Sequence, residues 1–187
     1  WLLSKTLKGY QLKPGDLWKH SLAAALVSKI ITGMINRDWV EDAFIAGLLH
    51  DAGKIIMDPY VEERNEAFEA HLQETACKFF KAEKQILGFD HAEVMSRASR
   101  FWRYPEAQSM AIRYHHYPMH SGNNRLAYIV HLANFVAKEA GFKTRETASS
   151  SGIDPHILEY LGFENAQLEP IIAEISTSVE KLSTDFQ

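Results

Sequence analysis

The stretch from Leu126 to Ala137 reads LAYIVHLANFVA, and it places apolar side chains over most of the surface of a helix. A helix that is apolar nearly all round is typical of a buried position in the core. Two polar residues, His131 and Asn134, interrupt it. A domain that buries a whole helix needs other helices to cover it, so this stretch favours a helical fold.

The sequence on either side predicts further helices and no convincing alternating strand. Apolar residues recur at helical spacing on both sides of the buried stretch, for example Leu22, Leu26 and Ile30. We expect helices over residues 17–33, 38–53, 59–84, 90–102, 105–116, 126–137, 155–161 and 168–182. In this pattern Gly53 ends the second helix and Pro59 opens the third. The predicted fold is all-α, a compact helical bundle, and residues 1–187 form a single domain.

The composition excludes several classes of protein. The net charge of −4 argues against a nonspecific nucleic-acid binder, which needs a basic excess. No apolar run approaches the roughly 18 residues of a membrane span. The single Cys excludes a disulfide scaffold and a Cys-ligated zinc cluster, whereas nine His residues stand out. Because the chain starts with Trp1 rather than Met, we expect it to be part of a longer protein.

The segment from Leu48 to Lys54, LLHDAGK, places His50 and Asp51 at the end of an apolar helix. A neutral imidazole and a carboxylate are both suited to a divalent transition metal, and the two oxygens of Asp51 can bridge two ions. An alternative carries equal weight on this segment alone, namely that Asp51 only caps a helix or pairs with Lys54.

Other histidines lie near helix ends or apolar faces. They come from separate elements, and they are His20, His91, His115 and His116. Together with His50 and Asp51 they are better explained as the ligands of a two-metal site than as unrelated core or surface residues. The remaining histidines, His71, His120, His131 and His156, are interpreted as ordinary residues, with His131 a hydrogen-bonded core histidine or a residue that supports the ligands.

The order of these residues resembles the HD phosphohydrolase superfamily, and the flanking phrases resemble its HDOD branch, the HD-related output domains of bacterial signalling proteins. The phrases are LWKHS at residues 17–21, FIAGLLHD at 44–51, LGFDHAEV at 87–94 and HLAN at 131–134. The resemblance extends from about Leu17 to Ile175. It implies an all-helical bundle around a His/Asp metal pocket, preceded in such proteins by a further helical subdomain.

The resemblance also implies a ligand set. His20, His50 and Asp51 would hold one metal, and Asp51, His91, His115 and His116 would hold a second. Iron, manganese, zinc and nickel all suit such donors, as one or two ions. The chain departs from the related HD-GYP proteins, which hydrolyse cyclic di-GMP. It lacks the GYP signature after His116, and Asn134 stands where catalytic relatives have Asp, which leaves at most a weak ligand.

Three functions follow from this reading. We favour a bacterial, cytoplasmic signal-transduction domain, with a signalling protein or an upstream domain as partner. The alternative is a metal-dependent phosphohydrolase acting on a nucleotide, cyclic dinucleotide or other phosphodiester, in which Asp51 and Lys54 are catalytic. In that enzyme Lys54 offsets phosphate charge, although a solvated lysine at a helix C-terminus explains it equally well. The third is a structural domain whose histidines are relics.

Overall fold

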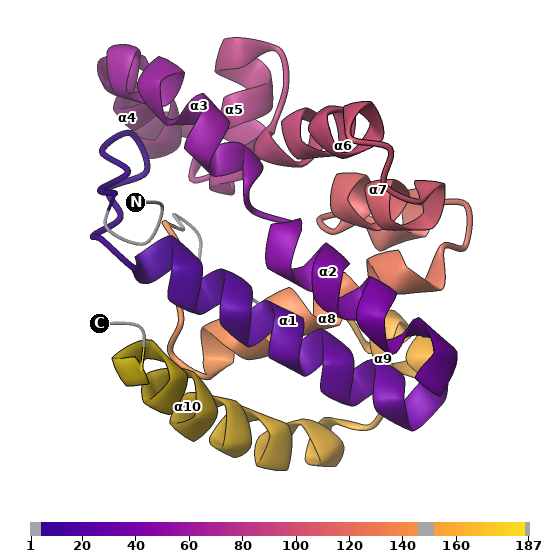
Figure 1. The fold of residues 1–187 in the computed structure, drawn as a ribbon. Coiled ribbons are helices and arrows are strands. Elements are labelled where there is room, and N and C mark those ends of the chain that lie inside the picture. The colour runs from indigo at the N-terminus through magenta and orange to yellow at the C-terminus, as the bar shows by residue number, and fades with distance from the viewer. Residues whose placement is uncertain (1–4, 146–151, 186–187) are drawn as a thin grey trace.

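The computed structural model describes residues 5–145 and 152–185, and every regular element among them is helical, as Figure 1 shows. The α-helices are α1 (Asp16–Ile35), α2 (Val40–Leu49), α3 (Gly53–Glu63), α4 (Asn65–Thr75), α5 (Phe79–Leu87), α6 (His91–Phe101), α7 (Glu106–Tyr114), α8 (Arg125–Glu139), α9 (Pro155–Leu161) and α10 (Leu168–Asp185). Short 3-10 helices cover Arg37–Trp39, Pro118–His120 and Asn165–Gln167. The predicted all-α class is confirmed.

Helix α8 is the centre of the main hydrophobic core. Ten of its fifteen residues are buried, as its nearly uniform apolar surface predicts. It packs against α1, α2, α7, α9 and α10, and Figure 1 shows α1 and α2 crossing in front of it. Because α1 and α7 both contact this helix, the residues that they carry at their inner faces and ends meet in the middle of the bundle.

A second, smaller core lies beside the first and joins the N-terminal loop to α3, α4 and α5. It is built from Leu7, Tyr10 and Leu12 of the loop together with residues such as Met57, Phe68 and Phe79. An isolated bridge between Leu7 and Leu12 closes the loop. This core holds the N-terminal loop against the helices that flank α6.

The single helix predicted over residues 59–84 is wrong, because the chain forms α3, α4 and α5 instead. Arg64 leaves the helical region with φ −109° and ψ 22°, and Ala76 adopts a left-handed conformation with φ 49°. A straight helix would separate Phe68 and Phe79 by about 16 Å. The break at Ala76, which lies between them, brings their rings to 5.3 Å, so burial of these side chains outweighs helix continuity there.

Gly53 and Pro59 also differ from expectation. Gly53 begins α3 rather than ending α2, and Pro59 lies inside α3. A Cβ atom on Gly53 would lie 2.0 Å from the backbone oxygen of His91. Glycine is therefore required here for the close approach of α3 to α6, not for a helix stop.

None of the helices among the described residues combines the length and the apolar character that crossing a membrane requires.

We expect Gly53→Ala to lower the free energy of unfolding by about 3 kcal/mol, because the added methyl group overlaps a backbone atom that cannot move alone. Gly33→Ala is the matched control. Gly33 lies inside α1 with open space around it, so this change should raise stability by up to about 1 kcal/mol. Urea unfolding followed by circular dichroism measures both variants. Equal stability of the two would contradict the close contact.

Candidate metal centre

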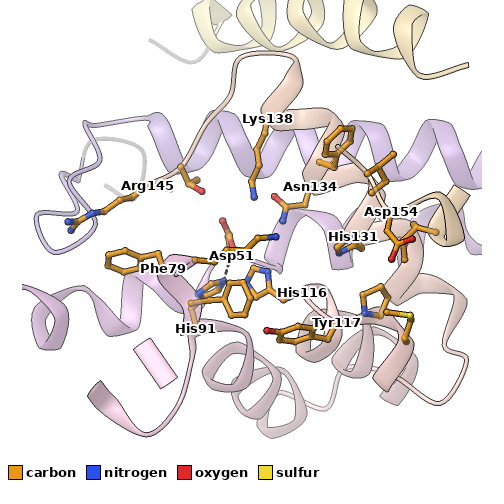
Figure 2. A pocket seen from close by; sticks show the side chains of 18 of the residues that line it. Asp51, Phe79, His91, His116, Tyr117, His131, Asn134, Lys138, Arg145 and Asp154 are labelled. Atoms are coloured by element: carbon orange, nitrogen blue, oxygen red, sulfur yellow. Dashed lines mark hydrogen bonds and ion pairs between the residues drawn. The ribbon is translucent and has the colours of Figure 1, made fainter. Parts of the chain in front are cut away.

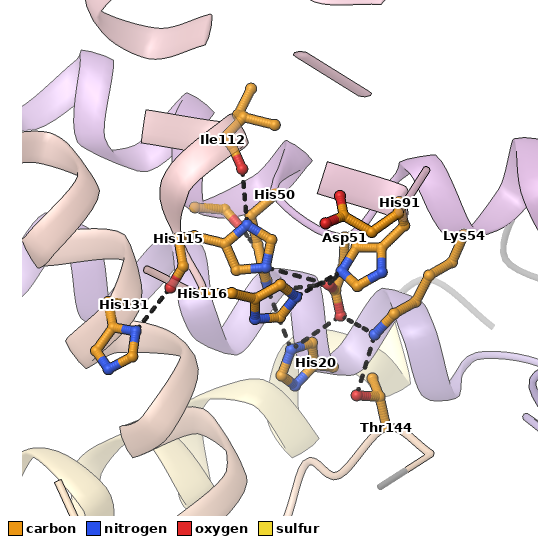
Figure 3. A network of polar contacts seen from close by, with 12 residues as sticks. His20, His50, Asp51, Lys54, His91, Ile112, His115, His116, His131 and Thr144 are labelled. Atoms are coloured by element: carbon orange, nitrogen blue, oxygen red, sulfur yellow. Dashed lines mark hydrogen bonds and ion pairs between the residues drawn. The ribbon is translucent and has the colours of Figure 1, made fainter. Parts of the chain in front are cut away.

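Six predicted ligands meet in one buried cluster, which Figure 3 shows. Each comes from a helix or from the turn that follows it. His20 lies on α1, His50 and Asp51 in the turn after α2, His91 at the start of α6, and His115 and His116 in the turn after α7. Asp90 fixes the start of α6 through a capping box with Glu93, as its sequence predicts. The structure therefore brings together all the residues that were predicted as ligands.

The carboxylate of Asp51 lies at the centre of this cluster, and its side chain is 2% exposed. Its Oδ1 atom is 3.0 Å from His91 Nε2, 3.6 Å from His50 Nε2 and 3.8 Å from His115 Nε2. Its Oδ2 atom is 3.4 Å from His20 Nε2. One carboxylate thus faces four imidazole rings.

Three of these rings are oriented by hydrogen bonds on their outer side. The Nδ1 atoms of His20, His50 and His115 donate to the backbone oxygens of Phe142, Gly47 and Ile112, each at 2.7 Å. A carbonyl only accepts, so Nδ1 carries the proton and the Nε2 lone pair points inward. The Nε2 atoms of His20 and His50 face each other at 3.2 Å, an arrangement that needs a cation or a proton between them.

A carboxylate orients the fourth ring. His91 Nδ1 donates to Glu83 Oε2 at 2.7 Å, while His91 Nε2 faces His116 Nε2 at 3.0 Å. The ring of His116 is stacked on Phe80 with a centroid separation of 3.9 Å. A histidine that donates its outer N–H to a carboxylate is the usual arrangement behind a metal ligand, because it fixes the ring and raises its basicity.

The pKa values divide the cluster into neutral and charged groups. Burial lowers the pKa of His20 to about 3 and also lowers the pKa values of His50 and His115. Burial alone would do the same at His91, but the Glu83 carboxylate raises the pKa of His91 to about 9. Burial tends to raise the pKa of Asp51, yet Lys54 and the neighbouring histidines hold it well below its usual range.

Lys54 is buried rather than solvated. It lies in the first turn of α3, and its Nζ donates to Asp51 Oδ2 at 2.5 Å and to Thr144 Oγ1 at 3.3 Å. The interpretation of Lys54 as a solvated lysine at a helix C-terminus is therefore wrong. The pairing of Asp51 with Lys54, the alternative to a ligand role, is present, but it uses only the Oδ2 oxygen and leaves Oδ1 facing the histidines.

The two polar residues of α8 have different surroundings. His131 Nδ1 donates to the backbone oxygen of His115 at 2.7 Å, which supports the turn that carries His115 and His116. Asn134 is 6% exposed, and its Oδ1 atom has no hydrogen-bond partner among the described residues. Of the other histidines, His120 and His156 are exposed, as predicted, and His71 is half-buried.

A cavity of about 250 Å³ opens on one side of Asp51, as Figure 2 shows. His131 and Asn134 of α8 line it together with Asp51, His91 and His116. Its wall carries four cationic residues and four aromatic residues, which are Lys54, Lys78, Lys138, Arg145, Phe79, Phe80, Tyr117 and Phe135. The wall also includes the carboxylates of Asp51 and Asp154, so its cationic residues exceed its anionic ones by two, and the cavity can receive a small anionic ligand beside the cluster.

The donor set suits divalent transition metals. The side chains form two groups, and within each group the potential ligand atoms all lie within 4.8 Å of one another. One group is His20, His50 and Asp51, and the other is His91, His115 and His116. Imidazole nitrogen and carboxylate oxygen are ligands that iron, manganese, zinc and nickel accept. Among the described residues, the buried His115 Nε2 atom, which can bind a metal, has no hydrogen-bond partner. The residues present therefore fit the metal centre that the sequence predicts.

Two residues of this network escaped the sequence analysis, Glu83 and Tyr10. Glu83 is completely buried on α5, and Tyr10 donates to it from the N-terminal loop at 2.8 Å. The one signal was that Glu83 lies on the apolar face of α5, next to Phe79, Phe80 and Ala82. A carboxylate on an apolar face needs a partner, but its distance from Tyr10 in the sequence hides which one.

We expect Lys54→Met to lower the free energy of unfolding by about 3 kcal/mol in the presence of a chelator, because the buried Asp51 charge loses its partner. Lys78→Met is the matched control. Lys78 lines the same cavity but is exposed, so the change should cost less than about 0.5 kcal/mol. Urea unfolding measures both. A loss at Lys54 no greater than that at Lys78 would show that the ion pair contributes little.

Three solved structures share the fold. A candidate signal transduction protein from Marinobacter aquaeolei VT8 is 19% identical, with a TM-score of 0.74 over 90% of this chain and 38% of its own. An HDOD domain protein with unknown function from Geobacter sulfurreducens is 23% identical, with a TM-score of 0.69 over 91% of this chain and 63% of its own. A candidate phosphohydrolase from Shewanella amazonensis SB2B is 18% identical, with a TM-score of 0.64 over 87% of this chain and 59% of its own. The chain spans less than two thirds of each. No curated protein is significantly similar to it.

The family model of the HDOD domain matches residues 2–118. The matched range contains all six residues of the His/Asp cluster, whereas His131 and Asn134 of α8 lie beyond it. Since the match covers more than half of the sequence, the chain belongs to the HDOD family.

Proposed function

We propose that this chain is a regulatory HDOD domain that binds one or two divalent transition-metal ions and responds to a phosphate-bearing ligand. One observation carries the metal site. Four histidines turn their Nε2 atoms toward a single buried carboxylate while their outer nitrogens are held by fixed acceptors. Such outer contacts are typical of metal ligands and are costly to build without one. His20, His50 and Asp51 hold one ion, and His91, His115 and His116 hold the other with Asp51 between them.

The ligand class is inferred from the cavity beside Asp51. Lys78 and Lys138 supply positive charge around it beside Lys54 and Arg145, which are paired with Asp51 and Glu69, and Tyr117 supplies an exposed aromatic ring. A nucleotide or another phosphodiester combines the matching features, since phosphate oxygens accept from lysine and arginine and a base stacks on aromatic rings. A signalling protein or an upstream domain is the partner that would read ligand binding, in a bacterial cytoplasm.

The second candidate function is a metal-dependent phosphohydrolase. A bound divalent ion lowers the pKa of coordinated water and polarises a phosphate oxygen. In this chain Lys54 would donate to a nonbridging phosphate oxygen, and Asp51 would hold Lys54 and the ligand set in register. Asn134 weighs against turnover, because an amide in place of a carboxylate brings no charge to the site. The regulatory role is therefore preferred.

Elemental analysis of protein prepared anaerobically without a metal-affinity tag tests the metal site. We expect between one and two transition-metal ions per chain, and close to none in Asp51→Asn, which keeps the side-chain shape but removes the bridging charge. His156→Ala is the matched control, because His156 is exposed on α9 and should leave the metal content unchanged. Wild-type protein free of transition metal would disprove the proposal.

A substrate panel separates the two functions. Nucleotides, cyclic dinucleotides and a simple phosphodiester are incubated with the protein in manganese or iron, and product is followed by chromatography. We expect binding without turnover, since Asn134 supplies no second carboxylate. Turnover that disappears in His50→Ala would instead establish the phosphohydrolase. Turnover that survives in His50→Ala would identify a contaminating enzyme.

A further inference from the structure

Tyr10 is the most deeply placed residue of the N-terminal loop. It is 1% exposed and lies inside the loop that the Leu7–Leu12 bridge closes. Its ring packs against Phe79 at a centroid distance of 5.2 Å, and its hydroxyl donates to Glu83 Oε1 at 2.8 Å. A buried tyrosine hydroxyl with a carboxylate partner is a specific contact rather than general packing.

Glu83 connects this tyrosine to the metal centre. Its Oε1 atom accepts from Tyr10, and its Oε2 atom accepts from both the backbone N and the Nδ1 atom of His91, at 2.9 and 2.7 Å. Both carboxylate oxygens are therefore occupied, and His91 is held at two points. With Nδ1 held in this way, His91 Nε2 faces Asp51 Oδ1 and His116 Nε2, each at 3.0 Å.

A second route runs from the same tyrosine to the bridging carboxylate. Lys54 Nζ lies 6.0 Å from the centre of the Tyr10 ring and 2.5 Å from Asp51 Oδ2. A cation at this distance from an aromatic face is attracted to it. Tyr10 thus contacts the residue that holds Asp51 and the residue that holds His91.

The backbone next to Tyr10 is fixed by separate elements of the fold. Gly9 N donates to Asp58 Oδ1 of α3 at 2.9 Å, and Arg145, which follows α8, donates to the Gly9 oxygen at 2.9 Å. A Cβ atom on Gly9 would lie 2.6 Å from the Asp58 backbone oxygen, so the loop packs directly on α3. Tyr10 therefore reaches Glu83 only when the loop is docked.

We propose that Tyr10 and Glu83 are positioning residues of the metal centre, which fix His91 and couple docking of the N-terminal loop to metal binding. The inference rests on the metal site proposed above. Coupling between two sites is reciprocal, so metal binding must stabilise the docked loop to the same extent that the docked loop favours metal. This gives the domain a connection between its metal centre and its N-terminal end.

Metal affinity measured by competition with a coloured chelator tests the positioning role. We expect Glu83→Gln to weaken binding about 10- to 100-fold and Tyr10→Phe to weaken it by roughly tenfold or less, as for other residues that orient a metal ligand. Glu74→Gln and Tyr60→Phe are the matched controls. Both residues are exposed and neither lines the cavity beside the cluster, so these changes should leave affinity unaltered.

Hydrogen exchange on the wild-type chain and on Tyr10→Phe tests the coupling. Metal should slow exchange of the amides of residues 9–12 in the wild type, and the effect should shrink in Tyr10→Phe because the loop no longer contacts Glu83. Nitrogen-15 NMR gives a measurement that needs no variant. The Nδ1 proton of His91 should be protected from exchange in the metal-free chain by its bond to Glu83.

The outcomes distinguish this inference from the function on which it rests. A wild type that binds no metal overturns the proposed function and this inference with it. A wild type that binds metal, with Glu83→Gln and Tyr10→Phe equal to their controls, overturns the inference alone. If Glu83→Gln fails to fold, the metal affinity of Tyr10→Phe and the exchange rate of the His91 Nδ1 proton test the inference instead. A rapidly exchanging His91 proton together with an unaltered metal affinity of Tyr10→Phe would also overturn the inference.

Discussion

The buried charge of Asp51 is the constraint around which the molecule is organised. A carboxylate removed from water costs several kcal/mol unless cations and hydrogen bonds compensate it. Here the compensation comes from Lys54 of α3 and from the charged His91 of α6, while the neutral rings of α1 and of the turns after α2 and α7 surround the same carboxylate. These segments must converge on one point, so the bundle and its central site depend on the same packing.

The outer contacts of the histidines give this cluster its direction. Backbone oxygens of Phe142, Gly47 and Ile112 hold the outer nitrogens of three rings, and Glu83 holds the fourth. The three backbone acceptors come from helix ends and a loop, where carbonyl groups lack helical partners. The inner nitrogens of His20, His50 and His115 are consequently presented as lone pairs, and the inner nitrogen of His91 is held toward Asp51. Such preorganisation suits a regulatory metal site and a catalytic one equally well. The preference for a regulatory role therefore rests on Asn134 and on the neighbouring cavity.

Much of this arrangement was predictable from local patterns. The apolar run around Ile129 identified the buried helix, and His50 with Asp51 identified the centre, because both signals are contained in a few consecutive residues. The helix predicted over residues 59–84 was wrong, and its break at Ala76 allows a contact between Phe68 and Phe79 that no local pattern records. Gly53 was noticed for the wrong reason, as its neighbour is the His91 backbone 38 residues away.

Local patterns are enough to establish the all-α class, the buried position of α8 and the six metal-ligand candidates, because helical periodicity and residue chemistry are properties of short segments. Three features emerge only from the packed bundle. Lys54 is buried against Asp51, Glu83 and Tyr10 lie behind His91, and the N-terminal loop contacts the residues that hold the site. These contacts join residues far apart in the chain. Their partners are chosen by burial and by the need to satisfy polar groups away from water, which depends on the packed bundle as a whole.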